Sequence, residues 1–553
     1  MTSTPAAHDP NKMAVLRRTQ AVFSVLLVLF VSPLPCHNVP AYQKPVMVQQ
    51  TGKVLPKPQM LTVSAEAYTL AMSGFKFTYG SSSQMCDIVD QAFRRYYDLI
   101  FVVDGVKKAP VVSKDMSELT ELQIMVKEPC TGVYPSLESS ENYTLTVAAP
   151  MGTLVADSAW GVLRGLETFS QLVYRTDDGM IIINKTTVDD FPRFAHRGIL
   201  LDTSRHFIPI KYIKQNLDAM AYNKFNVFHW HIVDDPSFPY QSVAFPDLSA
   251  KGAFNPYTHL YTQEDVKDVI EYSRLRGIRV VPEFDTPGHT ASWGAGLPGF
   301  LTPCYDGSAP NGKYYAANPM LNTTYDYMTK LLQEIKDVFP DKYVHLGGDE
   351  VSFNCWKSNP DITKFMEKMG FGTDYSKLEE YYIKNILDIT TSVGRDYIVW
   401  QEVLDNGVQA KSTVGEVWFE HPTIQAVLER LTAKGYRVLL AAGWYLNHDV
   451  YNPGTDWSTF YKLDPRVFNG TQAQKDLVIG GEACMWGEYV DGTNLIARLW
   501  PRASAVAERL WSNKDVTSMA DATVRMDEQR CRMVRRGLNA EPLHPGFCQF
   551  EYD

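Results

Sequence analysis

The sequence lacks the usual marks of nucleic-acid-binding, multi-span membrane and zinc-stabilised proteins. It contains no basic stripe or arginine-rich tail, and its formal net charge is −10, so we expect no nucleic-acid partner. No apolar run beyond residue 31 is long enough to span a bilayer. No Cys-x-x-Cys pair is present, which argues against a structural zinc site. What remains is a chain of 553 residues, long enough for one large domain and a smaller one.

The N-terminus predicts entry into the secretory pathway. Arg17 and Arg18 precede the apolar run 21–31, which is too short to span a bilayer and is typical of a signal peptide. We therefore predict a signal peptide over residues 1–36, with cleavage near residues 32–40; an uncleaved anchor is the alternative. Four Asn-x-Ser/Thr sequons agree with secretion and are candidate glycosylation sites. They are Asn142, Asn184, Asn322 and Asn469.

Eight cysteines are present, and a secreted chain favours disulfides. Pairing of neighbours along the chain suggests three bridges, although other connectivities remain open. The suggested pairs are Cys86–Cys130, Cys304–Cys355 and Cys531–Cys548. Cys484 lies in the apolar run 478–486 and is expected to be a buried thiol.

Residues 37–190 are predicted to form a small α+β domain. The segment 143–149 alternates like a strand, and apolar residues in 158–173 recur with helical spacing. Asp189-Asp190-Phe191-Pro192 is the predicted boundary, because proline interrupts both helices and strands.

Residues 191–553 alternate between strand and helix patterns. About eight strands are recognisable, from 197–203 to 477–483, and they predict a (β/α)8 barrel. One connecting helix is expected between an N-cap at Thr262 and a stop at Gly277. A long loop should follow residue 284, and 498–510 is predicted to be the last helix. A doubly wound open sheet is the alternative, but no Gly-x-Gly-x-x-Gly fingerprint follows an early strand.

Polar and aromatic side chains follow nearly every predicted strand. In a barrel the carboxyl ends of the strands carry the active site, so these residues should surround one pocket. They are Asp202, Arg205, Asp234, Asp235, Asp285, His289, Asp349, Glu350, Trp400, Gln401, Glu402, Trp418, Trp444, Tyr445, Asn447, Trp486 and Glu488. Carboxylates and tryptophans together predict acid/base chemistry in a pocket whose walls suit the apolar faces of sugar rings.

The strongest single signal is the stretch 345–351, in which two glycines end an apolar strand and Asp349 and Glu350 follow. Glu350 is a candidate proton donor for glycosidic-bond cleavage. Asp349 shares its backbone segment, so it is poorly placed as a nucleophile across the sugar and better placed to orient a substrate group. If that group is a 2-acetamide, its carbonyl oxygen can replace a protein nucleophile. A solvated acidic turn is the alternative for this stretch alone.

Several further residues have both a functional and a structural interpretation. Arg205 with a carboxylate such as Glu488 suits sugar hydroxyls, or it forms a structural ion pair. His289 supports the Glu350 region, or it is a core histidine. Three tryptophans wall the pocket or belong to the core. They are Trp400, Trp418 and Trp486.

Two other classes of function remain open. His229 and His231 form a His-x-His pair that can ligate a metal, as in a metal-dependent barrel hydrolase. No further His or Lys cluster completes such a site at the later strands. A secreted glycan-binding protein with an inactive hydrolase fold is the other alternative, although loss of the Asp349–Glu350 pair would be its usual mark.

The chain resembles glycoside hydrolase family 20, in particular the eukaryotic lysosomal β-N-acetylhexosaminidases, and more closely their acidic, alpha-type subunit. The resemblance covers nearly the whole chain after the signal peptide, and its motifs are highly specific. They are Leu201-Asp-Thr-Ser-Arg-His206, Phe228-His-Trp-His-Ile-Val-Asp-Asp235, Phe284-Asp-Thr-Pro-Gly-His289, His345-Leu-Gly-Gly-Asp-Glu350 and Gly481-Glu-Ala-Cys-Met-Trp-Gly-Glu488.

The resemblance implies a retaining, substrate-assisted β-N-acetylhexosaminidase that acts on terminal β-GlcNAc or β-GalNAc. Glu350 is then the general acid/base, and Asp349 orients the acetamido group, whose oxygen Tyr445 holds. The other implied site residues line the sugar pocket or support it. They are Trp400, Trp418 and Trp486 as walls, Arg205, Asn447 and Glu488 as sugar contacts, and Asp234 and His289 as hydrogen-bond partners around Glu350.

The resemblance also implies that no metal or other cofactor is needed and that the His229–His231 pair is structural. The three suggested disulfides match the family pattern. A dimer is expected, either of identical chains or with a related subunit. Ends of N-glycans, glycosaminoglycans or glycolipids are the implied substrates, and the lysosome or the extracellular space is the implied location.

Two positions depart from the family pattern. Asn447-His448 stands where one subunit type has Asn-Arg to accept negatively charged sugars; we hypothesise that protonated His448 favours 6-sulfated substrates only at acidic pH. The loop 306–310 resembles one that engages a lipid-presenting activator protein, but Ala309 stands where that loop has Glu. Activator-dependent ganglioside cleavage is therefore not expected.

Overall fold

The computed structural model describes residues 46–101, 116–408, 413–448 and 457–549. The predicted signal peptide, residues 1–36, lies outside these residues. No helix in the described ranges is long and apolar enough to cross a membrane.

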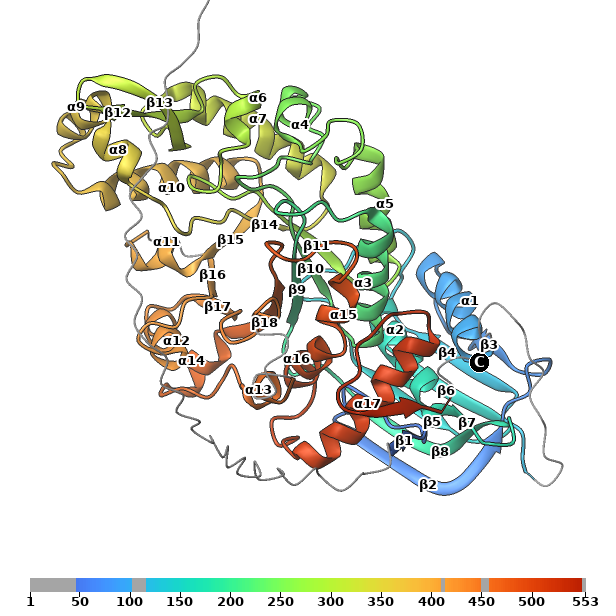
Figure 1. Ribbon diagram of the computed structural model, residues 1–553. Helices are drawn as coiled ribbons and strands as arrows, with labels where there is room; N and C mark the ends of the chain where they lie inside the picture. The colour runs from blue at the N-terminus through green and yellow to red at the C-terminus, as the bar shows by residue number, and fades with distance from the viewer. Residues whose placement is uncertain (1–45, 102–115, 409–412, 449–456, 550–553) are drawn as a thin grey trace, which may run out of the picture. The chain divides into compact units, whose positions relative to one another are not determined.

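The N-terminal part is built on a mostly antiparallel sheet of seven strands (Figure 1). Six of them lie in the order β2 (Met60–Thr69), β8 (Ile181–Asp190), β5 (Tyr143–Val147), β6 (Met151–Ala156), β4 (Glu121–Val126) and β3 (Lys76–Tyr79), and β7 (Val173–Arg175) also pairs with β8. Two helices, α1 (Asp87–Phe101) and α2 (Ala159–Leu172), pack with this sheet. Ser158 caps α2 by accepting from two backbone amides, as an N-cap should.

Every residue of α2 is buried, including its polar ones. One face packs on β5 and β6. The other face meets the barrel, where Arg164 donates to the carbonyl of Gly277 at 2.7 Å. Arg164 also pairs with Glu141, which holds Arg197 of the first barrel strand through a second bond of 2.7 Å. Buried ion pairs therefore join the two parts, and the predicted boundary near residue 190 stays a prediction.

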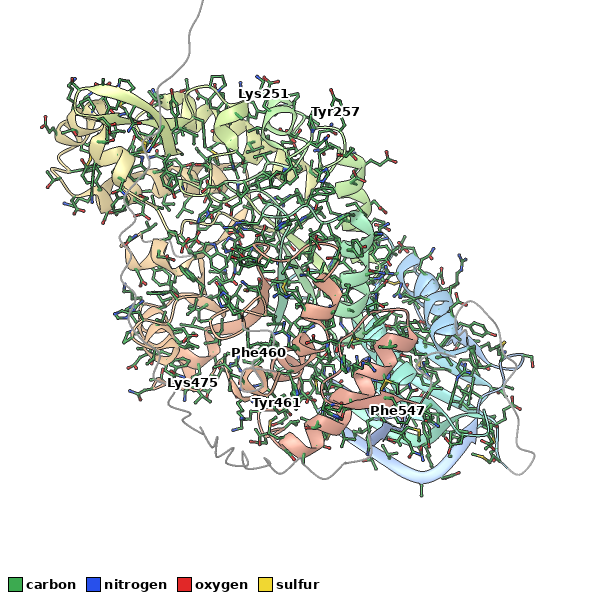
Figure 2. The ribbon with its side chains drawn as sticks, viewed as in Figure 1. Lys251, Tyr257, Phe460, Tyr461, Lys475 and Phe547 are labelled. Carbon is green, nitrogen blue, oxygen red and sulfur yellow. A yellow bond between two sulfur atoms is a disulfide. The ribbon has the colours of Figure 1, made fainter. Side chains whose placement is uncertain are left out.

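Eight parallel strands close into a barrel, which confirms the predicted (β/α)8 fold (Figure 1). In chain order they are β9 (His196–Asp202), β10 (Val227–His231), β11 (Arg279–Glu283), β14 (Tyr343–His345), β15 (Asp396–Trp400), β16 (Val414–Val417), β17 (Arg437–Leu440) and β18 (Val478–Met485). The main connecting helices are α3 (Ile210–Tyr222), α5 (Gln263–Arg274), α7 (Asn322–Val338), α10 (Tyr375–Ser392), α12 (Ile424–Ala433) and α16 (Arg502–Trp511). Buried side chains fill the ring of strands, so the barrel is a core and not a pore. Figure 2 draws the side chains on the same view of the ribbon.

Alternate strand residues point inward and form layers along the barrel, because successive side chains of a strand face opposite sides. The layer at the amino end is apolar and contains Val227, Val281, Tyr343, Ile398, Val414 and Leu439. Two residues further along four of these strands come buried histidines and glutamates, namely His229, Glu283, His345 and Glu416. The last layer is aromatic, with Trp400 and Trp486 beside Cys484, whose thiol is free and buried as predicted.

The helix α5 forms for the reason that the sequence indicates. Thr262 and Asp265 make a reciprocal capping box at its start. Gly277 follows its end with φ +67°, a conformation that favours glycine.

Two sequence-based expectations about elements are wrong. The long loop after residue 284 contains a short helix, α6 (Trp293–Gly296), and a hairpin of β12 (Leu301–Asp306) and β13 (Ala309–Ala317). The segment 498–510 is not the last helix, because it divides at Pro501 into α15 (Leu495–Leu499) and α16, and α17 (Met519–Arg535) follows. The buried face of α17 carries Arg525, Glu528, Gln529 and Arg532, so its helical period is not visible as an apolar stripe.

The shorter elements complete the chain. They are β1 (Val46–Val48), α4 (Asp247–Gly252), α8 (Asn354–Ser358), α9 (Pro360–Met369), α11 (Gln401–Asp405), α13 (Trp457–Lys462), α14 (Gln472–Asp476) and β19 (Gly546–Cys548). The structure forms all three suggested disulfides, Cys86–Cys130, Cys304–Cys355 and Cys531–Cys548.

The four sequons differ in accessibility. Asn142, Asn322 and Asn469 are exposed. Asn184 is half-buried, and its side-chain amide donates to the carbonyl of Ser64 at 2.9 Å. Three of the four predicted glycosylation sites are therefore exposed, although the Asn469 amide donates to Glu429 at 3.5 Å, and Asn184 would have to give up its hydrogen bond to Ser64.

Candidate active site

A cavity of about 560 Å³ opens at the carboxyl ends of the barrel strands. It brings together all but one of the predicted catalytic and substrate-binding residues. These are Arg205, His289, Asp349, Glu350, Trp400, Trp418, Tyr445, Asn447, Trp486 and Glu488. Asp234 lies just outside the lining, where it pairs with Arg205 and His289. His448 and Tyr489 also line the cavity.

Two glycines bring the carboxylates to the cavity. Gly347 and Gly348 follow β14 with φ +66° and +97°. A Cβ on Gly347 would lie 1.7 Å from Oδ1 of Asp285, so no side chain fits there. Gly348 donates its amide to the same oxygen at 2.8 Å. The turn therefore requires glycine for both conformation and space, and it delivers Asp349 and Glu350 to one face.

The two adjacent carboxylates have different environments. The side chain of Asp349 is 13% exposed and that of Glu350 is 60% exposed. Oδ1 of Asp349 is buried and has no hydrogen-bond partner among the described residues. Its other oxygen, Oδ2, lies 3.7 Å from Nε2 of His289, the same distance that separates this nitrogen from Oε2 of Glu350. Asp349 thus lines the cavity as a partly exposed carboxylate, while Glu350 lies at its open side.

His289 is an imidazolium between carboxylates. Its Nδ1 lies 3.2 Å from Oδ1 of Asp234. Burial opposes the charged ring, but Asp285 and then Asp234 raise the pKa of His289 to about 11. For Asp285, burial and the charge of Asp349 raise the pKa well above its ordinary value. The site therefore holds His289 protonated beside Asp349 and Glu350.

Arg205 is both ion-paired and exposed to the cavity. Its guanidinium lies 3.2 Å from Asp202 and 2.8 Å from Asp234, and it stacks 5.1 Å from the ring of Trp486. Its charge is attracted by Glu488, which lines the same cavity. The contacts to the two aspartates fix the guanidinium and leave it at the cavity wall, which Glu488 also lines.

Aromatic rings form the rest of the wall. The Trp400 indole donates to Glu283 at 2.9 Å and is only 1% exposed, so one side of it is core and its rim lines the cavity. Trp486 lies 6.0 Å from Trp400, and Tyr445 lies 6.4 Å from Trp486, measured between ring centres. The wall and core interpretations of these tryptophans both hold, because the rings separate the cavity from the packed barrel.

The His-x-His pair lies in the buried layer under this wall. His229 is 3.1 Å from Glu283 and 2.8 Å from Glu482, and His345 is 2.9 Å from Glu283. The ligand atoms of His229, Glu283 and His345 are close enough together to hold a metal ion. Burial opposes the charged form of His229, but Glu482 and Glu283 raise the pKa of His229 well above its ordinary value. A proton therefore competes with any metal cation for the ring nitrogens of His229. Neither His229 nor His345 lines the cavity.

Sequence reasoning left one contact of the wall unassigned. Glu402 accepts a hydrogen bond of 2.6 Å from the indole N–H of Trp418. The sequence could have indicated this role, because Glu402 directly follows the fifth barrel strand and the carboxyl ends of barrel strands form the active site. Tyr489, which extends the rim next to Glu488, gave no such signal, since it lies beyond a strand end in an irregular segment.

Comparison with known proteins agrees with this geometry. The sequence model for the Glycosyl hydrolase family 20 catalytic domain matches residues 194–514, and one described as beta-acetyl hexosaminidase like matches residues 54–172. The chain is 54% identical over 505 residues to the beta-hexosaminidase subunit alpha of Bos taurus, covering 90% of this chain and 95% of that protein. It is 48% identical over 549 residues to the beta-hexosaminidase subunit beta of Homo sapiens, covering 98% of each.

A solved structure shows the same architecture. The chitobiase of Flavobacterium johnsoniae superposes with a TM-score of 0.77 at 30% sequence identity, covering 89% of this chain and 74% of that one. The family model spans more than half of the chain, and the curated relatives span nearly all of it. The chain therefore belongs to glycosyl hydrolase family 20.

Proposed function

We propose that this glycoside hydrolase is a retaining β-N-acetylhexosaminidase that removes terminal, non-reducing β-GlcNAc or β-GalNAc. The observation that carries the proposal is the partly exposed carboxylate of Asp349 next to the accessible Glu350 in one aromatic-walled cavity. An acceptor in that place suits the N–H of a 2-acetamido group. A substrate that supplies its own nucleophile needs no second carboxylate across the sugar ring.

The reaction follows from these roles. Glu350 gives its proton to the glycosidic oxygen as the bond from that oxygen to the anomeric carbon breaks. The acetamide oxygen forms the new bond to the anomeric carbon, and Asp349 stabilises the positive charge that develops on the acetamide nitrogen. Glu350 then takes a proton from water as the water oxygen bonds to the anomeric carbon. The bond between the acetamide oxygen and the anomeric carbon breaks, which opens the ring that the acetamide had formed. Two displacements retain the β configuration.

The remaining residues bind and orient the sugar. Arg205, with its fixed donors, and Glu488 would bind the ring hydroxyls. Tyr445 would donate to the acetamide oxygen and keep it directed at the anomeric carbon. Asp234 and His289 would support Glu350 through the contacts described above, and Asn447, which lines the cavity, would contact a sugar hydroxyl. Trp400, Trp418 and Trp486 would exclude water around the acetamide.

The named relatives support further assignments. They are alpha and beta subunits of beta-hexosaminidase, so we propose that this chain forms a dimer with an identical or a related subunit in the lysosome or after secretion. Its substrates would be glycan ends on glycoproteins, glycosaminoglycans or glycolipids. His448, which lines the cavity with its ring 5.6 Å from that of Tyr445, would select 6-sulfated sugars when protonated. Ala309 is exposed on the β12–β13 hairpin, where activator engagement is not expected.

An inhibitor of matched chemistry tests the mechanism. A stable bicyclic thiazoline of GlcNAc resembles the cyclised intermediate, so it should inhibit hydrolysis of an aryl β-GlcNAc far more strongly than GlcNAc does. The matched control is an aryl β-glucoside, which lacks the acetamide and should be turned over poorly. Equal turnover of both substrates, or equal inhibition by thiazoline and GlcNAc, would exclude the substrate-assisted route. Loss of activity on chelation would favour the metal-dependent hydrolase. Absence of any turnover would favour the inactive glycan-binding protein.

A further inference from the structure

A second cavity, of about 370 Å³, lies between the β12–β13 hairpin and α8. The two elements pack against each other (Figure 1). Their contact is fixed, because the Cys304–Cys355 disulfide joins β12 to α8 and the backbone amide of Tyr305 donates to Oγ of Ser358 at 2.9 Å. The volume falls within the usual range for small-molecule sites, about 300–1,000 Å³, and the walls are already in place.

Six polar side chains of this lining have no partner within the described part of the chain. No hydrogen bond or ion pair of that part engages their hydroxyl, amide or ammonium groups. They are Tyr305, Lys313, Tyr314, Tyr315, Ser352 and Asn354. Tyrosine rings suit the apolar faces of a sugar, and hydroxyl and amide groups suit its hydroxyls. Lys313 is the only charged residue among the described residues of the lining, so it favours a ligand with a negative charge.

The cavity borders the main chain of the proposed acid. Ser352 in its lining is two residues after Glu350, so their Cα atoms lie at most about 7 Å apart. Tyr315 provides a second connection. Its hydroxyl and the carbonyl oxygens of Asp349 and Glu350 all lie within 3.9 Å of one point, the position that a Cβ on Gly288 would take. Tyr315 therefore lies both at the second cavity and beside the turn that carries the two carboxylates.

The order of the barrel strands places this cavity on the side where a leaving group departs. Arg205 and Glu488 follow β9 and β18, which are neighbours, whereas Glu350 follows β14 on the other side of the eight-stranded ring. The carbons C1 and C4 lie at opposite ends of a pyranose. A sugar whose hydroxyls contact Arg205 and Glu488 at one end can therefore present its glycosidic oxygen to Glu350 at the other. The β12–β13 hairpin precedes β14 and α8 follows it, so the sugar beyond this bond meets their cavity.

We propose that this second cavity is a subsite for the leaving-group sugar, and that Lys313 makes it favour an acidic one, with a carboxylate or a sulfate. This rests on the proposed function, because it takes Glu350 as the acid that protonates the glycosidic oxygen. Binding energy from a part of the substrate that does not react can position the bond that does. A terminal β-GlcNAc is then removed faster when the next sugar carries a negative charge.

Three disaccharides that differ only at C6 of the second sugar test the preference. In each, β-GlcNAc is linked to the 4-hydroxyl of glucose, of glucuronate or of glucose 6-sulfate. The parent should cleave the two acidic disaccharides with a kcat/KM about three- to fivefold above that for the neutral one, the size expected of an exposed ion pair. The ratio should fall at high salt, which screens such a pair. A preference for only one of the two acids supports the subsite and identifies the anion that it takes.

Lys313→Gln should bring both ratios to about 1, because it removes the charge and keeps a polar side chain of similar length. Its matched control is Lys368→Gln, which makes the same charge change on the exposed side of α9 and should keep the ratios of the parent. Tyr314→Ala should lower kcat/KM for all three disaccharides alike, by about three- to tenfold, because ring contacts do not depend on the charge. Tyr257→Ala, at a residue that is 90% exposed and does not line this cavity, should have no effect.

An aryl β-GlcNAc, whose leaving group is no sugar, separates failure of the subsite from failure of the proposed function. The subsite alone is overturned if the parent cleaves the aryl substrate but cleaves the three disaccharides equally well or not at all. It is also overturned if Lys313→Gln keeps the ratios of the parent. If the parent cleaves none of the four substrates, the proposed function is wrong and the subsite falls with it.

Discussion

The mouth of the barrel and the layer beneath it contain the same residue types, carboxylates and histidines, in opposite states. In the mouth, Glu350 is largely exposed and Asp349 keeps an unpartnered oxygen. In the layer below, Glu283 and Glu482 are fully buried, and each lies within 3.1 Å of two or more imidazole nitrogens. Buried carboxylates whose oxygens are all paired stabilise a fold, whereas catalysis needs an acid that the substrate can still reach. The difference between the sets is access, not composition.

The sharpest contrast is expected for the exposed acid. Glu350→Gln keeps the shape of the side chain but removes its proton, so kcat for an aryl β-GlcNAc should fall about 10³-fold or more while the melting temperature stays close to that of the parent. Steady-state kinetics and a thermal scan measure both. Glu367→Gln, on the exposed side of α9, is the control and should change neither. A Glu350→Gln enzyme within tenfold of the parent would show that the mouth does not work through this acid.

The second expectation concerns the orienting carboxylate. Asp349→Asn replaces the free acceptor with an amide, which cannot stabilise a positive acetamide nitrogen, so kcat should fall about 10²–10³-fold. The loss should be confined to 2-acetamido substrates, because weak turnover of an aryl β-glucoside does not use this contact. Kinetics on the paired substrates measure the ratio. A harmless Asp349→Asn would remove the substrate-assisted mechanism.

The buried layer should respond in stability. Glu482 lies 2.5 Å from His196 and 2.8 Å from His229. Burial favours its neutral form, but His229 and His196 hold the pKa of Glu482 well below its usual range. Glu482→Gln would remove one of the two carboxylates close to the buried His229 imidazolium, and also the partner of His196, so it should lower the unfolding free energy by up to about 3 kcal/mol. Urea unfolding should show this loss, with kcat of the remaining folded protein close to normal.

A surface ion pair provides the comparison for that loss. Glu66 pairs with Lys185 at 2.9 Å, and both side chains are about half exposed. Glu66→Gln should leave the urea midpoint nearly unchanged, because exposed pairs contribute little. If Glu482→Gln also left the urea midpoint nearly unchanged, the buried histidines would have to be neutral. The description of the buried layer as a set of ion pairs would then be wrong.

A third kind of carboxyl, buried without a cation, should make stability depend on pH. Glu379 is 3% exposed, and its pKa is raised from 4.5 to about 7 by burial. Between these values the folded protein holds a proton that the unfolded chain has lost, so this contribution is present below pH 4.5 and is lost as pH rises to 7. The unfolding free energy of Glu379→Gln relative to the parent should therefore increase by up to about 3 kcal/mol between pH 4.5 and 7.5. Parallel urea titrations at the two pH values measure it, and no change would place the native pKa near 4.5.

The smallest expected effect lies at the rim. Because His448 is exposed at the cavity, its protonation should favour a 6-sulfated aryl β-GlcNAc over the neutral one by a few-fold at pH 4–5, and the preference should vanish by pH 7. The ratio of kcat/KM for the two substrates across this range measures it. His448→Arg should prefer the 6-sulfated substrate at every pH in this range, and His448→Ala should show this preference at no pH. A flat ratio in the parent would mean that His448 does not contact the sulfate.

Local chemistry accounts for what could be predicted. The capping box at Thr262, the stop at Gly277 and the apolar strand before Gly347 act within a few residues, so each is visible in the chain. The same reasoning misses α17, because Arg525 and Glu528 are buried against partners far away in sequence: Arg525 pairs with Glu508, and Glu528 accepts from the backbone of residues 51–53. A polar face that folding buries cannot be recognised from its own periodicity.

The order of residues along the chain was enough to specify the barrel, the position of Asp349 and Glu350 at a strand end and the aromatic character of their surroundings, since strand periodicity and glycine placement are short-range properties. It did not reveal that Oδ1 of Asp349 has no hydrogen-bond partner among the described residues, that Asp202 and Asp234 hold Arg205, or that Glu402 accepts from the indole of Trp418. Asp202 and Arg205 share one turn after β9, whereas the pairing of neighbouring barrel strands brings Asp234 to Arg205 and Glu402 to Trp418.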